Sequence, residues 1–75
     1  MDTMDATPFA LRGEFITLDA LLKATGLAHS GGGAKVLIGE GRVRVNGDTE
    51  TRRGRKLRAG DLVQLGDQRV QISGG

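Results

Sequence analysis

Apolar residues recur at helical spacing in an early segment of this 75-residue chain. Leu18, Leu21 and Leu22 fall on one face, as the helical repeat requires for a stripe that packs against a core. Thr17 stands before them as a suitable N-cap, and Gly26 follows as a terminator. The pattern predicts a short amphipathic helix that begins after Thr17.

A second helix is predicted after a three-residue connector at 27–29. Ser30 is a preferred N-cap residue, and Ala34, Leu37 and Ile38 follow the helical spacing. Two short helices joined by so few residues must pack as an antiparallel or crossed pair.

Arginine and valine alternate over residues 42–45, which predicts a strand with valines on one face and arginines on the other. Asn-Gly at 46–47 indicates a tight turn. A two-residue turn would place Val43 opposite the charged Glu50. We therefore expect a bulged turn that brings a threonine onto the valine face.

The C-terminal part predicts a β-hairpin. Residues 62–65 and 68–72 alternate around Gly-Asp, and a two-residue loop there pairs Val63 with Val70 on the buried face. Residues 7–15, interrupted by proline and glycine, indicate an N-terminal edge strand or extended arm.

These elements predict a single α+β domain in which two short helices pack on a small, mainly antiparallel sheet. A chain of 75 residues buries only about 60% of its unfolded surface, which leaves no room for an enclosed active site. We expect the ends, residues 1–6 and 73–75, to be disordered.

Charge is sorted along the chain. Eight Lys and Arg against three Asp and Glu give residues 35–58 a net charge of +5, whereas residues 1–34 are net acidic. The stretch 49–57 is too polar for a core and is expected to be a loop or a solvent-facing edge strand. Residues 52–58, the basic segment, contain five cations. These repel one another unless a polyanion neutralises them, so the segment favours a nucleic-acid partner.

Composition excludes several functions. The chain has no Cys and one His, which argues against disulfides, thiol chemistry and a zinc site, and it shows no catalytic constellation. The acidic N-terminus lacks an apolar run, so we expect neither a signal peptide nor a membrane span, and a cytoplasmic location. With Phe9 and Phe15 as the only aromatic residues, base stacking on an aromatic platform is almost excluded.

Three glycines open the second predicted helix, although each costs up to about 1 kcal/mol relative to alanine. Bare glycine backbone at the positive end of a helix dipole leaves three amides accessible to a phosphate. A flexible connector that needs glycine for steric reasons explains the sequence equally well. A nucleotide P-loop does not, because no strand precedes the glycines and no Gly-Lys-Ser/Thr follows.

The order of these segments resembles the S-four-like RNA-binding domain family, and within it the small free-standing bacterial proteins of the YbcJ type. The resemblance is carried by the following residues: Leu18-Asp19 with Leu22, Ser30, Ala34-Lys35 with Ile38, the run 41–47 and Gly60-Asp61-Leu62-Val63. It implies a strongly bent sheet, an αL motif over about 17–47, and RNA contacts at the start of the second helix and on the next strand. Thr17 and Gly31 depart from the family, which often has arginine at both positions.

The resemblance places RNA contacts on Ser30, Lys35, Arg42, Arg44 and Asn46. Adding the glycine amides and the basic segment gives the candidate set: Ser30, Gly31, Gly32, Lys35, Arg42, Arg44, Asn46, Arg52, Arg53, Arg55, Lys56 and Arg58. The expected function is a monomeric, non-enzymatic module that grips structured RNA, ribosomal RNA above all, without cofactor, membrane or small-molecule substrate.

Two alternatives compete with this interpretation. The Val-Asn-Gly, Gly-Asp and terminal Gly-Gly sequences also resemble ubiquitin-like sulfur carriers, which open with a hairpin and one helix. A helix-turn-helix DNA binder needs base-reading side chains at the start of its second helix, where this chain has Gly31, Gly32 and Gly33.

Overall fold

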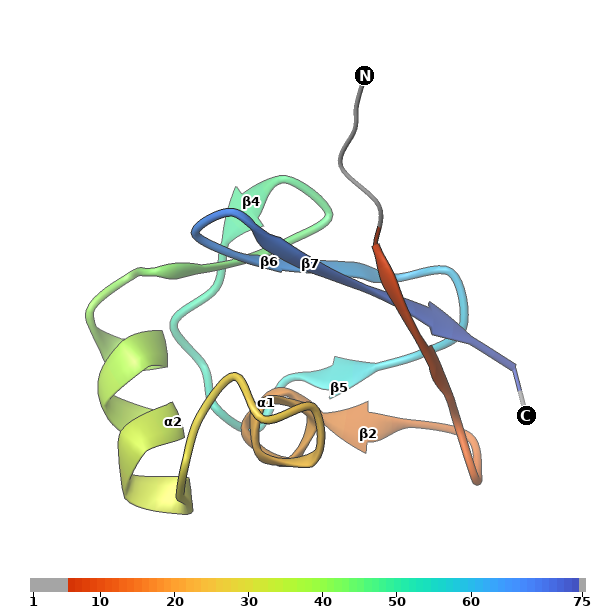
Figure 1. Cartoon of the computed structure of the whole chain (residues 1–75), viewed down its shortest axis with the longest axis horizontal. Coiled ribbons are helices and arrows are strands. Elements are labelled where there is room, and N and C mark those ends of the chain that lie inside the picture. The colour runs from red at the N-terminus through yellow and green to blue at the C-terminus, as the bar shows by residue number, and fades with distance from the viewer. Residues whose placement is uncertain (1–5, 75) are drawn as a thin grey trace.

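The computed structural model describes residues 6–74, which form two helices, a five-stranded sheet and a smaller sheet. Figure 1 shows both helices on the same side of the five-stranded sheet. This architecture confirms the predicted α+β class and the order of its helices. The elements are β1 (Thr7–Ala10), β2 (Ile16–Thr17), α1 (Leu18–Ala24), α2 (Gly31–Gly39), β3 (Val43–Val45), β4 (Asp48–Thr49), β5 (Lys56–Leu57), β6 (Leu62–Leu65) and β7 (Gln68–Ser73).

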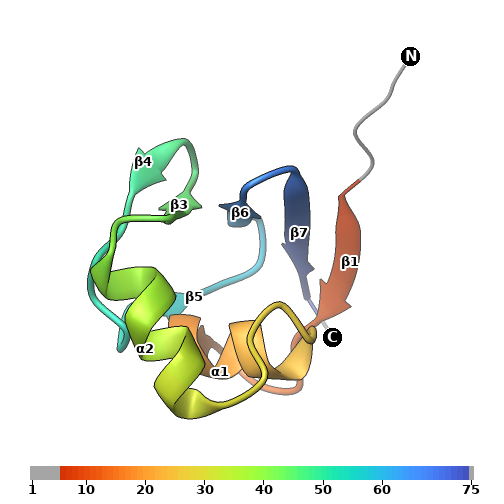
Figure 2. The same cartoon turned by 60° about the vertical axis from the view of Figure 1, so that its left-hand side comes forward.

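The strands form two sheets, where the sequence predicted one. The larger sheet has the order β1-β7-β6-β3-β4 and is antiparallel except that β1 runs parallel to β7. The smaller sheet pairs β2 with β5 antiparallel and lies beside α1 (Figure 2). The N-terminal segment therefore does form an edge strand, β1, which pairs with β7 near the other end of the sequence.

The core lies between the large sheet and the helices. Val45, Val63 and Val70 stand in register on three neighbouring strands and are buried, which confirms the predicted Val63–Val70 pair. Opposite them lie the buried leucines of α1 and the buried Ala34 and Ile38 of α2. The valine face of β3 is thus fixed inward, and its arginine is fixed outward.

The turn after β3 corrects the sequence prediction. Val45 pairs with Asp48 across Asn46 and Gly47, whose φ angles of 53° and 89° make a two-residue turn without a bulge. The Glu50 amide donates to the Val43 carbonyl at 2.9 Å, so Glu50 does lie opposite Val43. The residue is only 6% exposed. The prediction was wrong because it did not foresee that arginines nearby in the chain neutralise this carboxylate.

The basic segment caps the first helix. The Leu18 and Asp19 amides at the start of α1 donate to the carbonyls of Arg55 and Arg53, at 2.9 and 3.1 Å. Thr17 occupies the N-cap position without a side-chain cap bond, since its hydroxyl donates to Asp19 Oδ1 at 2.7 Å. That bond is the largest cause of a lowered Asp19 pKa. Residues 50–55 therefore form an anchored loop, as their polarity predicted.

Most of the residues that were predicted to be disordered cannot be compared with the structure. Residues 1–5 and Gly75 lie outside the described residues. Disorder was a wrong prediction for Ser73, which ends β7 and accepts the Leu11 amide at 2.9 Å on its carbonyl. Neighbouring strands supply backbone partners that the sequence around Ser73 does not reveal. Within the described range, β1 pairs with β7 and two helices follow β2, which disagrees with the opening hairpin of a sulfur carrier.

Candidate nucleic-acid interface

The N-terminus of α2 exposes glycine backbone next to a hydroxyl group. The predicted Ser30 cap is confirmed: its Oγ accepts the Gly33 amide at 3.1 Å and its carbonyl accepts the Ala34 amide at 2.9 Å. The expectation of three accessible amides is corrected to two, because the cap uses Gly33. The amides of Gly31 and Gly32 have no partner among the described residues, and both residues are exposed.

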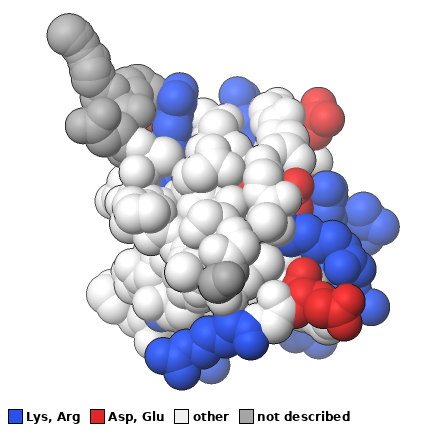
Figure 3. Space-filling view, turned by 90° about the vertical axis from the view of Figure 1, so that its right-hand side faces the viewer, with Lys and Arg blue, Asp and Glu red and all other residues white. Residues whose placement is uncertain are grey.

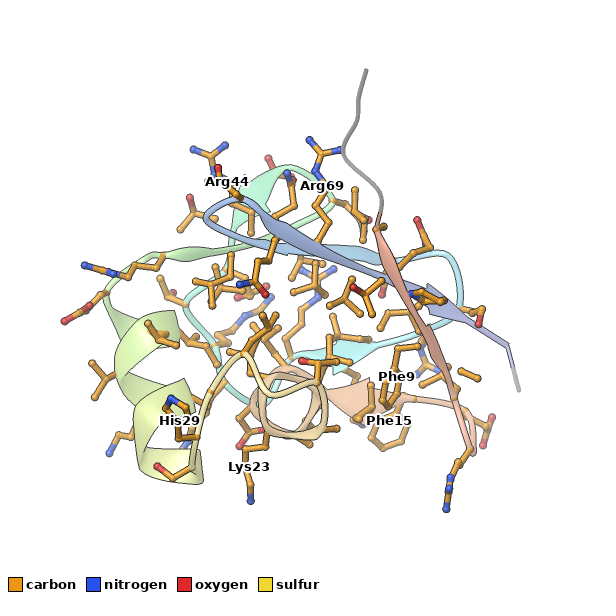
Figure 4. The ribbon with its side chains drawn as sticks, viewed as in Figure 1. Phe9, Phe15, Lys23, His29, Arg44 and Arg69 are labelled. Carbon is orange, nitrogen blue, oxygen red and sulfur yellow. The ribbon has the colours of Figure 1, made fainter. Side chains whose placement is uncertain are left out.

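Lysine side chains flank this helix start. Lys23, in the last turn of α1, passes 3.9 Å from the place that a Cβ of residue 31 would take. Figure 4 shows Lys23 at the same end of the molecule as the start of α2. Lys35 is exposed on the second turn of α2. Lys23 was absent from the predicted set, because only the packing of α1 against α2 brings it there.

The two arginines of the helix-to-strand segment are both exposed. Arg42 Nε lies 3.1 Å from Glu40 Oε1, and the two side chains are 65% and 54% exposed. An ion pair this open contributes little and is easily exchanged for a phosphate. Arg44 stands on β3 between two buried valines, so its side chain points away from the core. No acid is paired with Arg44 in the described part of the chain.

A groove of about 630 Å³ adjoins these arginines. Leu27, Leu37 and Leu65 contribute apolar surface to it, and Arg42, Arg44 and Gln64 contribute polar groups. The groove thus joins the connector between the helices to the ends of β3 and β6. A surface that combines apolar walls with guanidinium groups suits the sugar, base and phosphate of a nucleotide.

The outer face of the large sheet carries a row of polar side chains that includes one missed arginine. Arg44 is in register with Gln64, and Gln64 is in register with Arg69. Figure 4 shows Arg44 and Arg69 projecting from the sheet on the side away from the helices. The Arg69 Nε is buried without a hydrogen-bond partner among the described atoms. The alternation over 68–72 could have predicted this position, because it places the Arg69 side chain on the other face of the strand from the buried Val70.

Within the basic loop, two arginines are already neutralised. Glu50 Oε2 lies 3.1 Å from Arg52 Nε, and Glu50 Oε1 lies 2.7 Å from Arg55 Nη1. Hydrogen bonds from Arg52 and then Arg55 lower the Glu50 pKa from 4.5 to about 2, against the opposing effect of burial. Glu50 therefore relieves part of the predicted repulsion among the five cations within the protein itself.

The last two cations of the segment face another part of the molecule. Lys56 Nζ and Arg58 Cζ lie 5.0 and 5.8 Å from the centre of the Phe15 ring. Figure 4 shows Arg44 at the top of the molecule and Phe15 in its lower part. The structure therefore separates the predicted set into a surface along α2 and β3 and a second one around Phe15.

The Asn46 side chain stabilises the turn between β3 and β4. Its amide nitrogen donates to Asp61 Oδ1 at 3.1 Å, and its Oδ1 accepts the Leu62 amide at 2.9 Å. These bonds tie the β3–β4 turn to the start of β6. Both polar groups of the predicted contact residue therefore have partners within the fold.

Residues 6–74 contain no group of three or more His, Cys, Asp or Glu side chains placed to hold a metal ion. Over the same range, no helix is sufficiently long and apolar to cross a membrane.

Two bacterial proteins of known sequence are similar to this chain over most of their length. The chain is 43% identical over 60 residues to "Probable ribosome maturation protein RlbA" of Bacillus subtilis (strain 168), covering 80% of this chain and 84% of the relative. It is 42% identical over 57 residues to "Putative RNA-binding protein YbcJ" of Escherichia coli (strain K12), covering 76% and 81%.

A solved structure of the second of these relatives has a similar fold. The solution structure of E. coli YbcJ matches with a TM-score of 0.70 and 38% identity, over 97% of this chain and 91% of that chain. Its description names an αL motif involved in RNA binding. The S4 domain family matches residues 9–73, which is nearly the whole described chain. The chain belongs to the S4 domain family.

Proposed function

We propose that this protein is an RNA-binding module that grips structured RNA, specifically ribosomal RNA or an assembly intermediate of the ribosome. S4 family membership and the description of YbcJ support RNA as the ligand. The name of the B. subtilis relative, which refers to ribosome maturation, supports the ribosomal choice. The module acts in the cytoplasm as a monomer, without catalysis or cofactor.

The contacts lie along α2 and β3. The observation that carries this assignment is that exposed hydrogen-bond donors lie at both ends of the α2–β3 segment. The Gly31 and Gly32 amides open it, and Arg42 and Arg44 line the groove at its far end. The predicted residues that we assign to this surface are Ser30, Gly31, Gly32, Lys35, Arg42 and Arg44. Arg53, whose carbonyl accepts the Asp19 amide at the start of α1, is proposed as a further contact.

A charge-based grip makes binding depend on salt. If about four phosphates are neutralised, log K falls against log salt with a slope of about −3 to −4. The measurement is a fluorescence-anisotropy titration of a labelled ribosomal RNA hairpin at several salt concentrations. A flat response between low and moderate salt would refute the charge grip, and no binding at low salt would refute the proposed function.

The double variant Arg42→Ala with Arg44→Ala tests whether RNA phosphates bind at this surface. Both side chains are exposed, so the thermal melt stays unchanged. The salt slope becomes shallower by about 1 to 2, since each lost phosphate contact removes about 0.9. Arg42→Lys with Arg44→Lys is the matched control, because it keeps both charges and the slope. Unchanged binding of the double alanine variant would move the site elsewhere.

A further inference from the structure

The small β2–β5 sheet presents an aromatic ring among cations. Phe15 precedes β2, and the register Ile16–Leu57 and Thr17–Lys56 places it opposite Arg58. Leu57 is buried beneath, while Phe15, Lys56 and Arg58 are exposed on the other face. Lys56 and Arg58 both reach the ring, at 5.0 and 5.8 Å from its centre.

An apolar groove of about 540 Å³ adjoins the same ring. Phe9, Phe15 and Ile16 contribute to it, together with the exposed Arg12. Both aromatic residues of the chain thus meet at one site, although they are six positions apart in the sequence. Figure 4 shows the two rings near one another.

The surroundings of this groove are cationic on several sides. Arg12, Lys56 and Arg58 border it or its ring, and Glu14 is the acid that lies in the same segment of chain. Figure 3 views this side of the molecule: Lys and Arg atoms lie at the top, right and bottom of a broad uncharged area, and Asp and Glu atoms lie among them along the right. Apolar surface bordered by cations suits a base with its phosphates better than it suits an uncharged peptide.

We propose that this groove binds one unpaired nucleotide of the RNA, with its base against the Phe15 ring and its phosphate at Lys56 and Arg58. The inference rests on the proposed function and adds a site that is separate from α2 and β3. In the free protein, the cations cover the ring through an interaction that is weak at exposed positions. A bound base takes their place on the ring while the cations turn to the phosphate. Base stacking therefore enters the recognition despite the low aromatic content of the chain.

The test uses Phe15→Trp as a reporter, because the chain contains no Trp and no Tyr. Its emission is titrated with hexaadenylate RNA and with an abasic phosphodiester of equal length and charge. We expect hexaadenylate to quench the emission and the abasic strand to leave it unchanged. Equal quenching by both strands, or by neither, would overturn the proposal.

Phe15→Leu supplies the affinity measurement. Phe15 is 44% exposed, so leucine keeps its inner contacts and the melt reports whether the fold is intact. We expect hexaadenylate to bind this variant at least about fivefold more weakly, the lower end for one base–aromatic stack. Lys56→Gln with Arg58→Gln, made in the Phe15→Trp background, removes the proposed phosphate contact: hexaadenylate should bind more weakly and with a shallower salt dependence, while a saturating concentration still quenches the tryptophan emission.

The outcomes separate this inference from the proposed function. If a ribosomal RNA hairpin binds with its salt slope intact while Phe15→Leu changes nothing, the nucleotide site is wrong and the proposed function stands. If hexaadenylate quenches the reporter but the hairpin does not bind at low salt, the proposed function is wrong and the site stands. An emission shift that depends on protein concentration alone assigns the groove to a second copy of the chain and overturns the proposal.

Discussion

Replacing Glu50 by glutamine removes the negative charge that holds the basic loop. The carboxylate accepts hydrogen bonds from the Arg52 amide and Nε at 3.1 Å and from Arg55 Nη1 at 2.7 Å. Its side chain is 8% exposed, and that of Arg55 is 32% exposed. Glutamine keeps the shape and an acceptor oxygen but leaves two guanidinium groups without a counter-charge. A partly buried cation without a partner is costly, so the variant unfolds more easily.

The magnitude follows from the Glu50 pKa, which falls from 4.5 to about 2 on folding. Because the folded-state pKa is depressed, the stabilisation is complete above the unfolded value and is lost as the pH falls from 4.5 towards 2. At 1.36 kcal/mol per unit, the shift corresponds to about 3 kcal/mol. Screening by water around the exposed Arg52 reduces the expected effect to about 2 kcal/mol.

Urea denaturation of the wild type and Glu50→Gln at several pH values from 7 to 2 measures this effect. The free energy of unfolding should differ by about 2 kcal/mol at pH 7, and the difference should shrink towards zero near pH 2. Glu40→Gln is the matched control, since its pair with Arg42 is exposed and should contribute below about 0.5 kcal/mol. Equal stability of wild type and Glu50→Gln at pH 7, or a difference constant from pH 5 to 2, would refute the reasoning.

Two further variants test the ends of the α2–β3 segment. Alanine at Gly31, Gly32 and Gly33 meets nothing closer than 3.5 Å, so the triple variant should be more stable by about 0.5 kcal/mol per site in a thermal melt. Its RNA affinity should fall if the amides contact phosphate, and unchanged affinity would refute that contact. Asn46→Ala loses two side-chain hydrogen bonds at a positive φ and should cost about 2 kcal/mol in urea denaturation. Weaker RNA binding by Asn46→Ala with an intact melt would instead make Asn46 a contact.

Local patterns predicted the elements well because their causes are local. The leucine stripe, the Ser30 cap and the Val63–Val70 hairpin each depend on residues within a few positions of one another. The parallel pairing of β1 with β7 joins the two ends of the chain. Such a pairing depends on the packing of everything between them, and the residues of β1 do not reveal it.

Glu50 shows where a general rule misled the sequence analysis. Charged residues are rarely buried unless they are paired, so the turn was expected to avoid placing Glu50 beside the core. Its partners stand only two and five positions further along the chain. The turn geometry and the ion pairs depend on one another, and judging the turn alone gave the wrong register.

The candidate site shows a related difficulty, because counting cations does not say which of them are available to a ligand. Eight lysines and arginines lie between residues 35 and 58. Glu50 holds two of these, Arg52 and Arg55. Lys56 and Arg58 lie over Phe15, on another part of the surface from Arg44. Four of the eight, Lys35, Arg42, Arg44 and Arg53, then remain for the α2–β3 surface and the start of α1. This number matches the proposed contact of that surface with about four phosphates, and it gives a shallower expected salt slope than eight cations would.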